Sequence, residues 1–177
     1  MRALILAVVL AVAGCSAQAA QETTRTAATP PELSATDLSG TDLAFVDLLI
    51  PQNTSALAAL DLAEPGSALR PVAERVAATY RAELEQARAV LARTGRQESG
   101  QHEGHDMPGM ITAAELASIR HSPDVDGQLR TLLRAQFEEA RTVARAELAS
   151  GTHPPVRDLG ASIDRTRAEF LALLGAA

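Results

Sequence analysis

The sequence predicts an all-α protein built as an up-down four-helix bundle. Apolar residues recur every three to four positions over four long stretches, which is the spacing of a buried helix face. Aromatic residues make up only 2 % of the 177 residues and Trp is absent, so the core must consist of Leu, Ala, Val and Ile. Sequences rich in Ala and Leu favour helix over strand. We therefore exclude an all-β sandwich or barrel and expect long helices joined by short connections.

The first helix is predicted to begin with Thr41 as its N-cap and to end at residues 64–66. Pro51 lies inside this stretch and predicts a kink or a restart of the helix. The second helix is predicted over residues 69–94, with Gly95 as its C-terminal stop. The apolar stripe of the first helix also passes through Asn53, a polar amide.

Residues 95–111 are polar and Gly-rich and lack helical periodicity, which predicts a long loop. Thr112 and Glu115 then match a capping box, which predicts one short extra helix through Ile119. A further long helix is predicted from Asp124 or Asp126 to Ser150, and Pro154 opens the last one.

Two polar amides lie on otherwise apolar faces, Asn53 in the first helix and Gln136 in the fourth. A buried amide without partners costs about 1–3 kcal/mol, so each needs an explanation. One interpretation is a hydrogen bond across the bundle that fixes helix register. The other is a ligand site or the remnant of one.

The N-terminus has the features of a lipoprotein signal peptide over residues 1–15. Arg2 precedes an uninterrupted apolar run over residues 3–13, which suits a signal sequence and is too short to span a bilayer. Residues 12–15 resemble a lipobox, in which Cys15 becomes the lipidated first residue. A small-x-small signal peptidase site at residues 17–19 and a plain core thiol are the alternatives. We favour lipidation, because the single Cys lies where a lipobox requires it.

Residues 16–40 are rich in Ala, Thr and Pro and predict a disordered tether, followed by a bundle domain over residues 41–177. We therefore expect a protein of the cell envelope, anchored by lipid on the extracytoplasmic side of a membrane.

Composition and motifs exclude several function classes. The chain has no Lys, and its 16 Arg and 22 acidic residues give a net charge of −6, which argues against nucleic-acid binding. It has no Gly-x-Ser-x-Gly, no Gly-rich phosphate loop, no zincin motif and no helical Glu-x-x-His, so we predict no catalytic residues and no enzyme activity. His121 and His153 are isolated.

The remaining His and Met residues concentrate in residues 102–110. His102 and His105 are three positions apart, as are Met107 and Met110. Imidazole and thioether together suit Cu(I), whereas imidazoles alone suit Cu(II) or Zn. Alternatively, Met107 and Met110 only pack as apolar plugs against the bundle.

Three segments resemble the domain-of-unknown-function 305 family, which includes CopM-type copper-binding proteins. Residues 45–56 resemble its first motif, typically Met-Ile-Pro-His-His-x-x-Ala, and residues 105–116 are similar to its middle loop and short helix. Residues 132–140, followed by 144–151, resemble its second motif, Met-Ile-x-His-His-x-x-Ala. The resemblance implies a ferritin-like bundle over about residues 41–175.

The family's helix-borne metal ligands are missing from this chain. The first His-His pair falls on Gln52 and Asn53, and the second on Gln136 and Phe137. The resemblance therefore supports only the loop residues as metal ligands: His102, His105, Met107 and Met110. We expect a non-catalytic lipoprotein with a degenerate family site and weak binding of copper or another soft metal in this loop. The alternative is a structural module whose Arg-rich helix faces bind another envelope protein.

Overall fold

The computed structural model describes residues 37–176, which contain five helices and no strand. The helices are α1 (Gly40–Leu60), α2 (Arg70–Arg93), α3 (Ala113–Arg120), α4 (Val125–Ser150) and α5 (Pro154–Ala176). The prediction of an all-α bundle is confirmed. The signal peptide, Cys15 and nearly all of the predicted tether lie outside the described residues.

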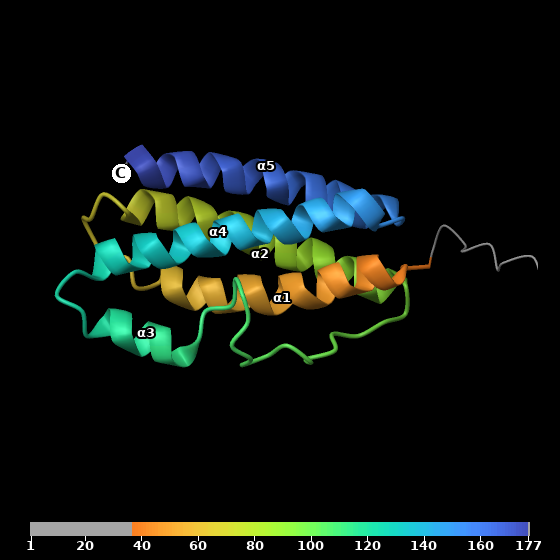
Figure 1. Cartoon of the computed structure of the whole chain (residues 1–177), viewed down its shortest axis with the longest axis horizontal. Coiled ribbons are helices and arrows are strands. Elements are labelled where there is room, and N and C mark those ends of the chain that lie inside the picture. Colours follow the sequence, from red (N-terminus) through yellow and green to blue (C-terminus); the bar gives the residue numbers. More distant parts are fainter. Residues whose placement is uncertain (1–36, 177) are drawn as a thin grey trace, which may run out of the picture. The chain divides into compact units, whose positions relative to one another are not determined.

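The four long helices pack around one another, as Figure 1 shows. α4 packs mainly against α5, α1 against α2, and the two pairs meet through contacts of α1 with α4 and of α2 with α5. The short helix α3 packs against α4. Two apolar clusters form the core, and Leu and Ala contribute most of their side chains, as the composition requires.

α1 begins earlier than predicted. Its N-cap is Ser39 rather than Thr41, because Ser39 and Asp42 form a capping box. The Asp42 carboxylate accepts from the Ser39 N–H at 2.7 Å, and the Ser39 hydroxyl accepts from the Asp42 N–H at 3.2 Å. The helix also ends earlier, at Leu60, because the chain turns before residues 64–66.

Pro51 does not restart α1, which runs through it as one helix. A proline inside a helix removes one backbone hydrogen bond, and tertiary packing must offset that loss. Here Leu49 and Ile50 before it and Ala56 after it are buried. α1 is long and apolar enough to cross a membrane by length and composition alone. Its buried residues belong to both core clusters, so it packs as one of the core helices of the bundle.

The other helix boundaries lie within one or two residues of the predictions. Thr112 and Glu115 form the predicted capping box, and Asp124 rather than Asp126 is the N-cap of α4. Gly151 follows the last residue of α4, and Pro154 begins α5, both as predicted. Near its end, α4 buries Glu147, whereas the apolar neighbour Leu148 is only partly buried.

Candidate functional site

The loop between α2 and α3 is fastened to α1 near its His and Met residues. The Gln52 side chain donates to the carbonyl of Pro108 at 3.2 Å, and the N–H of Ile111 donates to the Ser55 hydroxyl at 3.2 Å. Gly109 has a φ of 79°, and a Cβ there would lie 2.8 Å from Nε2 of Gln52. Only glycine adopts this backbone so close to α1, and the loop therefore has a defined path.

The four predicted ligands are divided among three cavities around this loop. His105 and Met110 line one of about 420 Å³ against Ile50 and Pro51 of α1. Met107 and Met110 line a second, of about 400 Å³, on the side of α4. His102 lines a third, much smaller one. Met110 thus lines both larger cavities, with His105 in one and Met107 in the other.

Burial differs sharply within the predicted set. Met110 is 8 % exposed and packs as the apolar interpretation expects, whereas His105 is exposed and His102 and Met107 are partly buried. Among residues 37–176, no three His, Cys, Asp or Glu side chains are placed to hold a metal ion.

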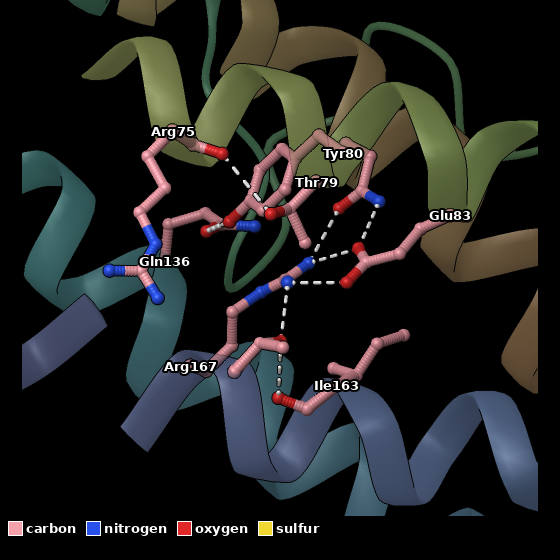
Figure 2. Close-up of polar contacts among 9 residues, drawn as sticks. Arg75, Thr79, Tyr80, Glu83, Gln136, Ile163 and Arg167 are labelled. Carbon is pink, nitrogen blue, oxygen red and sulfur yellow. Dashed lines mark hydrogen bonds and ion pairs between the residues drawn. The ribbon is translucent and has the colours of Figure 1, made fainter. Parts of the chain in front are cut away.

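A buried arginine, which the sequence did not predict, lies at the centre of a polar cluster in the core. Arg167 of α5 is fully buried and reaches across the core to α2 (Figure 2). Its two terminal nitrogens donate to the two carboxylate oxygens of Glu83 at 2.7 and 2.6 Å. A planar guanidinium that faces a carboxylate in this bidentate way makes the strongest kind of charged hydrogen bond.

Side chains from three helices complete this cluster. Asn53 of α1 donates to Glu83 at 2.9 Å and accepts from Arg167 at 3.2 Å. The guanidinium carbon lies 4.0 Å from the centre of the Tyr80 ring, which is a cation–π contact. The Tyr80 hydroxyl donates to the side-chain oxygen of Gln136 on α4. The two amides that interrupt the apolar stripes thus hydrogen-bond across the bundle.

Burial and neighbouring charges shift the pKa values in this cluster. Burial is the main cause of the raised pKa of Tyr80. The positive charge of Arg167 lowers this pKa, and the negative charge of Glu83 raises it further. Burial alone would lower the pKa of Arg167, but Tyr80 and Glu83 outweigh it, and the net shift is upward. Arg167 is therefore a permanent cation in the core.

One sequence signal could have revealed Arg167. It lies four residues after Ile163 and three before Phe170, on the buried face of α5. Charged residues are rarely buried unless they are paired, so an Arg on this buried face indicates an acidic partner on another helix.

The family model for a domain of unknown function (DUF305) matches residues 42–175. The chain belongs to the DUF305 family. A crystal structure of a DUF305 fragment from Deinococcus radiodurans is similar in fold, with a TM-score of 0.69 and 19 % identity, and the match covers 78 % of this chain and 95 % of that one. No curated protein matches the sequence.

In this DUF305 domain, the four positions to which the sequence resemblance assigns the paired His of the family motif each have a structural contact. Gln52 holds the loop through Pro108, and Asn53 bonds Glu83 and Arg167. Gln136 accepts from Tyr80, and Phe137 packs against Phe170 with ring centres 5.6 Å apart. The motif positions therefore stabilise the bundle and the loop.

Proposed function

We propose that this protein is an exported, lipid-anchored, non-catalytic lipoprotein of the cell envelope, built on a ferritin-like up-down bundle. Its lipid on Cys15 anchors it to the extracytoplasmic side of a membrane. The metal site of the bundle has degenerated, and weak binding of copper persists in the loop of residues 102–110. The observation that carries the metal proposal is that Met110 lines one cavity with His105 and another with Met107.

The donor set favours Cu(I) over harder metals. A thioether and an imidazole are soft ligands, and they suit Cu(I), which accepts few ligands. Three of the four candidates, His105, Met107 and Met110, line the two cavities that share Met110. His102 lies in a separate cavity, so we assign it the smallest contribution.

The core argues against a metal between the helices. Asn53 and Gln136 stand where one residue of each His pair would be, and both contribute to the cluster around Arg167. Glu83, the carboxylate at this place, already accepts from both terminal nitrogens of Arg167, so it is not free to bind a metal ion.

The test is a titration of the purified chain with Cu(I) and Zn(II), against Met110→Leu and His105→Ala. We expect micromolar binding of Cu(I) that falls at least tenfold in each variant. Leucine keeps the apolar volume of Met110, so loss of binding reports the sulfur. His121→Ala is the matched control, because His121 lies at the C-cap of α3 outside the loop, and it should leave binding unchanged.

The alternative function is a structural or protein-interaction module of the envelope without a metal. It is favoured by the burial of Met110, which packing alone explains. Absence of micromolar Cu(I) binding by the unmodified chain would reject the metal proposal and leave this alternative.

A further inference from the structure

Two buried carboxyl groups meet where the start of α1 contacts the turn between α4 and α5. Asp42 is 0 % exposed and Glu147 is 1 % exposed. One Asp42 oxygen accepts from the N–H groups of Thr152 and His153, both at 3.0 Å. The other accepts from the Ser39 N–H and from the Thr152 hydroxyl at 3.2 Å. Asp42 therefore ties the first turn of the domain to a turn 110 residues later.

Glu147 lacks such donors. Neither of its carboxylate oxygens has a hydrogen-bond donor among the described residues. Its side chain lies over Gly151, where a Cβ would come within 1.8 Å of one of those oxygens. Its acidic neighbour is Asp42, which accepts from the N–H of Thr152, the residue after Gly151, and whose charge acts on the Glu147 carboxyl. A buried carboxylate without donors is costly to keep charged, and two carboxyl groups can bond to each other only when one of them holds a proton.

The surrounding groups indicate which carboxyl holds the proton. Burial raises the pKa of Asp42, but the bonds from Ser39 and from the backbone of His153 outweigh it and bring that pKa below its usual range. Burial and the neighbouring Asp42 raise the pKa of Glu147 from 4.5 to about 7, against the opposing charge of Arg157 on α5. A proton shared by the pair therefore resides on Glu147 rather than on Asp42, and it is held below about pH 7.

The charged and titratable groups around the pair come from three elements. α1 contributes Asp42, α5 contributes Arg157, and the turn contributes His153, whose Nδ1 is buried without a partner. Arg157 donates to the carbonyl of Gly151 at 2.7 Å, so its guanidinium is held by the turn. No donor in this set satisfies a charged Glu147.

We propose that protonated Glu147 and charged Asp42 form a pH-sensitive clasp, closed in acid, which loosens the α4–α5 turn from the start of α1 when Glu147 loses its proton. The loss removes the hydrogen bond between the carboxyls and leaves two buried like charges in contact. The clasp thus controls how firmly the first turn of α1 is held to the α4–α5 turn. The proposal is independent of metal binding.

The sign of the pH dependence follows from the raised pKa. An acid whose pKa is higher in the folded chain than in the unfolded chain stabilises the fold in its protonated form. For Glu147 this contribution is complete below the unfolded pKa of 4.5 and is lost as the pH rises through the folded pKa of about 7. An opening that releases Glu147 to water should therefore become about 70-fold more favourable between pH 5 and pH 8.

The test is amide hydrogen exchange of the full chain at pH 5 and pH 8, corrected for the intrinsic rate of each amide. The probes are the N–H groups of Thr152 and His153, which donate to Asp42. We expect their protection to fall at least tenfold at the higher pH. In Glu147→Gln the side-chain amide can donate to Asp42 at every pH, so protection should not change.

Glu138→Gln is the matched control, because Glu138 is exposed on the same helix, and it should retain the pH dependence of the unmodified chain. Equal protection of the two amides at both pH values, or an equal loss in Glu147→Gln, would overturn the proposal. A carboxyl NMR titration of the unmodified chain adds a readout that needs no variant. Its midpoint for Glu147 should lie near 7, and a midpoint at the usual 4.5 would also overturn the proposal.

Discussion

Replacement of Arg167 by methionine should be among the most damaging single changes to the core. It removes both bonds to Glu83 and the contact with the Tyr80 ring. Glu83 is only 3 % exposed and would keep one donor, the side chain of Asn53. Removing one partner of a buried ion pair costs about 3–5 kcal/mol, because the remaining charge is left without compensation. Methionine fills much of the vacated volume, so little cavity cost is added, and we expect the free energy of unfolding to fall by about 3–5 kcal/mol.

Urea unfolding followed by helical circular dichroism measures this loss. Arg165→Met is the matched control: Arg165 is exposed on the same helix, and its replacement should change the free energy of unfolding by less than about 0.5 kcal/mol. Adding Glu83→Gln to Arg167→Met removes the isolated charge and should restore about 1–3 kcal/mol. A cost below about 1 kcal/mol for Arg167→Met, or a double variant no more stable than that single one, would refute the account of the cluster.

Two further predictions concern the ionisation of Tyr80 and the membrane anchor. Tyr80 is the only Tyr in the chain, so an ultraviolet absorbance titration reports its ionisation alone. Because burial raises its pKa, the neutral phenol stabilises the fold fully below about pH 10, and this contribution is lost as the pH rises further. Ionisation should therefore begin only with alkaline unfolding, and a midpoint near 10 in the folded chain would contradict the buried position. Cys15→Ser should move the protein from the membrane to the aqueous phase in detergent partitioning, whereas unchanged partitioning would exclude the lipid anchor.

Helix positions were predictable because local signals determine them. The spacing of apolar residues located all four long helices, and Thr112, Gly151 and Pro154 marked boundaries that the structure confirms. The start of α1 was misplaced for a physical reason. Ser39 and Thr41 are both good N-caps, and the choice depends on Asp42, whose carboxylate also binds the α4–α5 turn.

The polar clusters were less predictable because their members are distant in sequence. Asn53 and Gln136 were identified as anomalies on apolar faces, but nothing local indicates that Glu83 and Arg167 are their neighbours. The burial of Glu147 was not predictable for another reason, because its apolar neighbour Leu148 fits the buried stripe of the helix equally well. The His and Met loop was found from composition, yet its division among three cavities depends on the contacts of Gln52 and Ser55 with the loop.

The place of Arg167 in the last helix has a consequence for chain synthesis. Residues 40–150 can form their helices as they emerge, but the carboxylate of Glu83 then points into a core that holds no positive charge. We expect such an incomplete chain to remain hydrated at its centre and open to proteases, because the cation that allows the core to exclude water arrives only with α5. Closure of the bundle thus depends on a residue of α5, and a product truncated before this helix would not reach the same packed state.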